Sequence, residues 1–135
     1  MKEKEVEYVD LRFTDPRGKL QHLTMDGKMV DEKMLNEGVF FDGSSIAGWK
    51  AINESDMILK PDLERQIIDP FTSHTTLVLF CDVFDAVKKD PYERDPRSIA
   101  KKAEAYLKNR ALATKLILVP KQNFLYSMML NLKMI

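Results

Sequence analysis

The residues whose types could carry chemistry are concentrated in one polar loop. It reads FDGSSIAGWK over residues 41–50 and continues as NESD over residues 53–56. Two glycines and two serines beside the single tryptophan are typical of a shaped loop that presents one side chain, here the Asp42 carboxylate. Such a carboxylate either serves a site, by holding a cation or accepting a proton, or only caps backbone amides in an Asx turn. Residue types alone favour the capping role, because polar loops are common and few of them are functional.

Other candidate residues give weaker signals. His22 and His74 have no cysteine or histidine partner at metal-ligand spacing, so both are interpreted as structural or solvated. The Gly43-Ser44-Ser45 segment lacks the lysine and glycine spacing of a phosphate-binding loop. Cys81, the only cysteine, follows the apolar run LVLF and is expected to be buried rather than nucleophilic.

Composition excludes several classes of protein. The chain has 135 residues, of which 44% are hydrophobic and 31% charged, as in ordinary soluble domains. Its 21 basic and 21 acidic residues argue against nucleic acid or an anionic membrane as the main partner. No apolar run is long enough to span a bilayer, and the MKEKE start is too polar for a signal peptide. With one cysteine, a cytoplasmic protein is expected.

The first half of the sequence predicts a hairpin and a short helix ahead of the polar loop. Apolar and polar residues alternate over 9–13 and return over 20–25, with turn chemistry at residues 15–18. Asp31 and Gly38 are expected to start and stop a helix at 31–37. Residues 38–56 are expected to form a loop.

The second half predicts two strands and a longer helix, which completes an α+β domain. A short strand is expected at 57–61, ending at Pro61, and a central, fully buried strand at 75–83. A helix is expected over 95–107, with Asp95 as its cap and Pro96 in its first turn. Its apolar face is predicted to consist of Ile99, Ala103, Tyr106 and Leu107.

The composition changes abruptly near the C-terminus. All five glycines lie between Gly18 and Gly48, and no acidic residue follows Glu104. The remaining stretch is basic and rich in methionine. Within it, residues 116–119 are apolar enough to form an accidental strand, and residues 120–135 are expected to have low order.

Several blocks together resemble the N-terminal domain of prokaryotic type I glutamine synthetase. They are VDLRFTD at 9–15, FDGSSI at 41–46 with WK at 49–50, NESDM at 53–57, IDPF at 68–71 and RDPRSIA at 94–100. The resemblance implies a β-grasp (ubiquitin-like) fold over residues 5–108, with a mixed sheet and packing helices. Residues 109–135 are then an appended tail.

The resemblance also implies a function and a set of site residues. The family joins ammonia to glutamate with ATP and Mg or Mn, in dodecamers whose active sites lie between the N-terminal domain of one subunit and the C-terminal domain of its neighbour. By resemblance, Asp42 binds ammonium and helps to deprotonate it, Ser45 lines the same loop, and Asp56 acts at the subunit boundary.

The resemblance breaks at the family's metal-binding block. That block reads GPEAEFF or similar, and its glutamates bind the divalent metal, whereas this chain has VPKQNF at 119–124. Lys121 and Asn123 stand where the two glutamates are expected, and neither supplies the anionic oxygen that magnesium prefers. We therefore expect no cofactor on this chain and no activity from it alone.

The genetic code suggests an origin for the break. Permitted codons for Leu118–Ile135, regrouped one base earlier, encode GPEAEFFVFDDVKFEDD, which resembles the family's continuation. The same frame can encode GIGDKAYF across residues 110–118. We therefore predict a single frameshift near Asn109, which is either genuine or a sequencing error in a full-length, active enzyme.

Two functions remain open at this point. The first is an inactive N-terminal portion of glutamine synthetase. The second is a non-catalytic β-grasp module that inserts into rings of the intact enzyme and modulates them. In both cases the expected partners are glutamine synthetase subunits.

Overall fold

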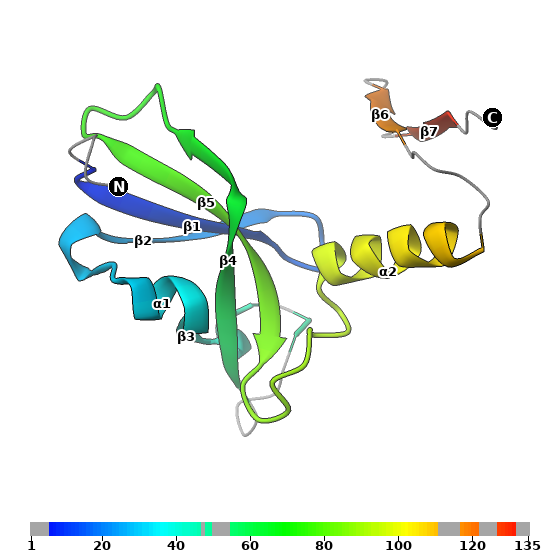
Figure 1. Cartoon of the computed structure of the whole chain (residues 1–135), viewed down its shortest axis with the longest axis horizontal. Coiled ribbons are helices and arrows are strands. Elements are labelled where there is room, and N and C mark those ends of the chain that lie inside the picture. The colour runs from blue at the N-terminus through cyan, green and yellow to red at the C-terminus, as the bar shows by residue number, and fades with distance from the viewer. Residues whose placement is uncertain (1–5, 47, 50–54, 111–116, 122–126, 132–135) are drawn as a thin grey trace. The chain divides into compact units, whose positions relative to one another are not determined.

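A five-stranded mixed sheet forms the centre of the first of two units into which the chain divides, residues 1–98 and 99–135 (Figure 1). The computed structural model describes residues 6–46, 48–49, 55–110, 117–121 and 127–131. The strand order is β2-β1-β5-β4-β3, in which β1 and β5 are parallel and the other neighbours antiparallel. The strands are β1 Tyr8–Thr14, β2 Leu20–Asp26, β3 Val39–Asp42, β4 Asp56–Ile68 and β5 Thr76–Asp85.

The predicted hairpin is confirmed, and a local carboxylate closes its turn. Asp15 Oδ1 accepts hydrogen bonds from the amides of Arg17 and Lys19, both at 2.9 Å. Gly18 has φ +83°, a conformation that glycine adopts without the clash of a Cβ. The turn residues therefore fix the register in which β1 and β2 pair.

The core lies on one face of the sheet, and β5 is its central strand, as predicted. Along β5, buried and less buried residues alternate near its end, as expected for a strand with two unlike faces. The ten residues of the buried apolar cluster are Val9, Leu11, Phe13, Trp49, Met57, Leu59, Leu77, Leu79, Cys81 and Val83.

Both helices begin where the sequence predicts. Asp31 caps α1, Glu32–Glu37, by accepting from the Met34 amide at 2.7 Å, and Gly38 ends it with φ +90°. Asp95 is fully buried and caps α2, Pro96–Asn109, through the amide and hydroxyl of Ser98.

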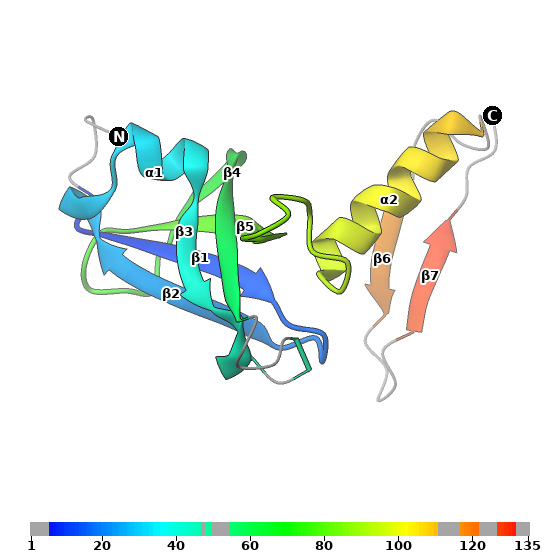
Figure 2. The same ribbon diagram turned by 90° about the horizontal axis from the view of Figure 1, so that it is seen from below.

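The prediction of a loop over 38–56 is wrong in its first part. Residues 39–42 form β3, which pairs with β4 (Figure 2), and Gly43–Ser45 form the short 3-10 helix η2. Another such helix, η1, spans Gly27–Met29. The partner of β3 lies beyond the polar loop, so the local composition, dominated by glycine and serine, conceals this strand.

The prediction that the next strand ends at Pro61 is also wrong. β4 continues to Ile68, with a shift of register between Pro61 and Gln66. Proline is tolerated in a sheet beside such an irregularity, because the ladder is already interrupted there.

The second unit contains most of α2 and a two-stranded antiparallel sheet of β6, Ile117–Lys121, and β7, Ser127–Asn131 (Figure 2). β6 corresponds to the predicted accidental strand, while β7 lies in the segment expected to have low order. On α2, Ile99 and Tyr106 are 54% and 57% exposed, so much of the predicted apolar face is open. None of the helices in the described part of the chain has the length and apolar character needed to cross a bilayer.

Candidate functional site

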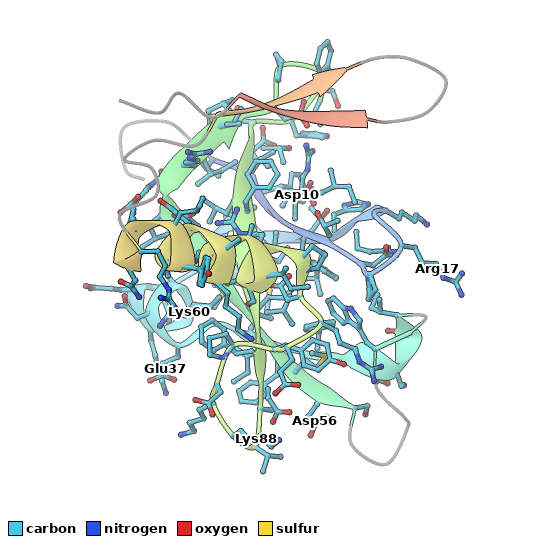
Figure 3. The ribbon with its side chains drawn as sticks, turned by 90° about the vertical axis from the view of Figure 1, so that its right-hand side faces the viewer. Asp10, Arg17, Glu37, Asp56, Lys60 and Lys88 are labelled. Carbon is cyan, nitrogen blue, oxygen red and sulfur yellow. The ribbon has the colours of Figure 1, made fainter. Side chains whose placement is uncertain are left out.

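Two carboxylates face each other at one end of the sheet. Asp42, the last residue of β3, is the direct cross-strand partner of Asp56, the first residue of β4. Both side chains are exposed, and Asp56 lies at the end of the sheet in Figure 3. Directly opposed residues on neighbouring strands have Cβ atoms about 4.5–5.5 Å apart, and like charges in that arrangement repel. The pair is therefore an anionic position that a bound cation would stabilise.

Hydrogen bonds hold the Asp42 carboxylate in its ionised form. Its Oδ1 accepts from the Ser44 amide at 2.9 Å, which makes Asp42 the cap of η2. Hydrogen bonds from the Ser44 side chain and amide, and from the Ser55 side chain, lower the pKa of Asp42 below its ordinary value. A carboxylate has about four lone-pair positions, so the capping bond leaves acceptor capacity for a ligand.

Glycine at position 43 lets η2 approach β4. The Gly43 amide donates to the Ser55 carbonyl at 2.8 Å. A Cβ on Gly43 would lie 2.9 Å from Met57 Cγ and 3.0 Å from that carbonyl oxygen, and Met57 is fully buried. The close approach of the two backbones therefore depends on the missing side chain.

An aromatic cluster supports the loop that follows Asp42. Trp49 is only 5% exposed, and its ring centroid lies 5.6 Å from Phe13, 5.9 Å from Phe41 and 5.7 Å from Tyr92. Aromatic pairs at these separations stabilise beyond the area that they bury. The described part of the loop therefore has an apolar base at Trp49, while Asp42 and Ser45 are exposed.

The structure brings together the three predicted site residues. Ser45 donates its hydroxyl to the Asp42 carbonyl at 2.6 Å, and Asp42 pairs with Asp56. Lys121 is the last residue of β6, and Asn123 lies outside the described residues. The described residues contain no group of three or more side chains that could hold a metal ion.

A polar network centred on the buried Asp10, with partners on β1 and β2, was not predicted from the sequence. Asp10 accepts from Arg12 Nε at 2.7 Å, from Thr24 Oγ1 at 2.8 Å, and lies 2.9 Å from His22 Nδ1. Arg12 also donates to Asp69 at 2.8 Å. Asp10, Arg12, His22 and Thr24 line a cavity of about 570 Å³. The sequence signal for this network was the register of the hairpin, which sets Asp10 opposite Thr24 and Arg12 opposite His22.

The histidines thus have structural partners, in line with their interpretation. His74 Nδ1 lies 3.0 Å from the Glu7 carboxylate, and the ring of Tyr8 contacts it edge-on. Cys81 is buried, as expected, and burial raises the pKa of its thiol to about 12.

Comparison with known proteins identifies the domain. The sequence profile described as "Glutamine synthetase, beta-Grasp domain" matches residues 5–86. The chain is 57% identical over 124 residues to a glutamine synthetase of Rhizobium meliloti (strain 1021), covering 92% of the chain and 26% of the relative. It is 48% identical, over the same shares, to the enzyme of Escherichia coli (strain K12).

Solved structures show the same fold. The Plasmodium falciparum glutamine synthetase determined by cryo-electron microscopy superimposes with a TM-score of 0.78 at 23% identity, covering 98% of this chain and 27% of that one. The chain spans about a quarter of the length of these relatives. The matched profile covers more than half of the chain, and the chain therefore belongs to the glutamine synthetase β-grasp family.

Proposed function

We propose that this chain is the N-terminal portion of a glutamine synthetase, and that it supplies the ammonium-binding carboxylate of an active site completed by another subunit. The observation that carries the proposal is the opposed pair of Asp42 and Asp56 at an exposed end of the sheet. The lowered pKa of Asp42 keeps that side chain anionic, as a cation-binding carboxylate requires. Ser45 lies in the same loop, bonded to the Asp42 backbone.

The chain alone is expected to be inactive. It spans about a quarter of its glutamine synthetase relatives, and the family resemblance places the ATP, glutamate and Mg or Mn sites in the C-terminal domain. An active site that lacks half of its groups loses the positioning on which catalysis depends. By this proposal, the partners are full-length glutamine synthetase subunits in the cytoplasm.

Complementation between subunits tests the proposal. Full-length Rhizobium meliloti subunits are prepared with asparagine in place of their own loop aspartate, refolded with this chain, and assayed for glutamine formation. The wild-type chain should restore activity, and the chain carrying Asp42→Asn should not. Equal restoration by both chains would show that Asp42 is not the functional carboxylate.

The same mixture tests the alternative function, a non-catalytic module that enters rings and modulates them. In this case the chain co-elutes with the dodecamer and changes the activity of unmodified enzyme, but it restores nothing to the defective subunits. A chain that stays separate from the ring in size-exclusion chromatography would contradict both functions.

We also propose that the tail arises from a frameshift near Asn109. The proposal rests on the GPEAEFF block encoded one base out of frame across residues 118–125. Alignments with the relatives cover 92% of the chain, so they extend past Lys108 into this region. DNA sequencing from the Leu107 codon through several hundred bases past Ile135 decides the matter. Codons that do not regroup into a long open frame would refute it.

A further inference from the structure

The far end of the Asp42 loop is held by side chains from the segment that connects β5 to α2. The hydroxyl of Tyr92 donates to the carbonyl of Trp49 at 3.1 Å. One terminal nitrogen of Arg94 donates to the carbonyls of Gly48 at 3.2 Å and Trp49 at 3.4 Å. These contacts link segments that are more than forty residues apart in the sequence.

Tyr92 and Arg94 together form a clamp on the loop. A series of backbone hydrogen bonds connects this clamp to Asp42. The Ile46 amide donates to the Gly43 carbonyl at 3.1 Å, and the Trp49 amide donates to the Ile46 carbonyl at 3.2 Å. Gly43 directly follows Asp42, which caps η2 from its other end. Two successive backbone hydrogen bonds therefore lie between Trp49 and the residue that follows Asp42.

The connecting segment is itself anchored to the central strand. The Tyr92 amide donates to the Val83 carbonyl of β5 at 2.8 Å, and Pro91 forms a bridge with Phe84. Tyr92 also packs its ring against the buried Trp49 indole. Tyr92 therefore joins the loop to the central strand of the sheet.

We propose that Tyr92 and Arg94 are positioning residues for Asp42, which they act on through the loop and do not touch. They fix the loop before the other half of the active site arrives, so that less ordering remains to be done on assembly. This inference rests on the proposed function for its purpose. The claim that Tyr92 and Arg94 hold the loop and orient Asp42 does not depend on that function and is tested on the chain alone.

The test compares two substitutions with matched controls in the full 135-residue chain. Tyr92→Phe keeps the ring contact and removes the donor, and Arg94→Met keeps an unbranched aliphatic side chain and removes the charged guanidinium donors. Tyr106→Phe and Arg65→Met, at exposed positions outside the loop, are the controls. Amide hydrogen exchange and the titration of the Asp42 carboxyl are measured by NMR.

Loss of one hydrogen bond should accelerate exchange of the Trp49 and Ile46 amides by about two- to tenfold. The Leu79 amide in the core should be unchanged, and the titration midpoint of Asp42 should move up toward its ordinary value. Unchanged exchange at Trp49, or equal acceleration at Leu79, would overturn the proposal. Faster exchange at Trp49 with an unchanged Asp42 midpoint would also overturn it, because the clamp would then act only on its own end of the loop. None of these readouts requires a glutamine synthetase partner, so failure of the clamp is distinct from failure of the proposed function.

Discussion

Substitution of Gly38 by alanine should be among the most damaging single changes in the domain. Gly38 ends α1 with φ +90° and leads into β3, the strand that carries Asp42. A Cβ at this position would lie 2.5 Å from Ile58 Cγ2 and 2.7 Å from the Leu59 carbonyl oxygen. Both atoms belong to β4, so relief of the overlap requires the pairing of β3 and β4 to shift.

Gly18 provides the matched control. It has a similar φ of +83°, but a Cβ there would meet no atom within 4 Å. The positive φ alone costs an alanine about 1–2 kcal/mol. At Gly38 this cost lies at the upper end, because its ψ of 178° belongs to a region that is nearly restricted to glycine. Overpacking in a tight site adds about 1–3 kcal/mol. We therefore expect Gly18→Ala to lower the free energy of unfolding by about 1–2 kcal/mol and Gly38→Ala by about 2–5 kcal/mol.

Urea unfolding followed by emission of the single tryptophan, Trp49, measures the difference. With an m-value of about 1–3 kcal/mol/M, the Gly38→Ala midpoint should fall about 0.3–3 M further than that of Gly18→Ala. Equal midpoints for the two variants would show that β3 and Ile58 yield without cost, and would refute the overlap argument. A circular dichroism spectrum of each variant establishes that it is folded before denaturant is added.

Three further predictions concern the cap, the cysteine and the polar network. Asp95→Ala should destabilise the domain by about 1–2 kcal/mol in urea unfolding, because the fully buried cap loses its bonds to Ser98, and Asp95→Asn should recover part of the loss. Cys81 should react with a thiol reagent at pH 8 no faster than the domain unfolds, since it is buried and its pKa is raised to about 12; rapid labelling of folded protein would contradict this. Burial raises the pKa of Asp10, but hydrogen bonds from Arg12 and two β2 side chains outweigh it and lower the pKa. The stability that ionised Asp10 contributes is therefore present at pH values above the ordinary pKa of 3.8, and it is lost as the pH falls through the lower pKa of the folded state. Asp10→Asn should consequently flatten the acid side of a plot of thermal midpoint against pH.

Features specified by neighbouring residues could be predicted from the sequence. The turn at Asp15 and the caps at Asp31 and Asp95 each depend on one side chain and amides within a few residues of it, and the stop at Gly38 depends on a positive φ that glycine adopts readily. Their chemistry is the same in a peptide and in a folded domain, so type and spacing suffice.

Features specified by distant partners could not be predicted in this way. β3 has only four residues, and its pairing with β4 depends on residues on the other side of the polar loop. The continuation of β4 past Pro61 depends in the same way on β5, with which both of its segments pair. Proline and glycine indicate breaks locally, and here the sheet overrides them.

The geometry around Asp42 is compatible with both roles that the sequence left open, capping of the turn and cation binding. Capping occupies part of the acceptor capacity of the carboxylate and lowers its pKa, which is also what a cation-binding group requires. The pairing of β3 with β4 then sets Asp56 directly opposite, at a position where a capped turn needs no second carboxylate. A cation shared by the two carboxylates, as proposed above, would account for that second charge, and Asp42 would then cap the turn and bind the cation in one geometry.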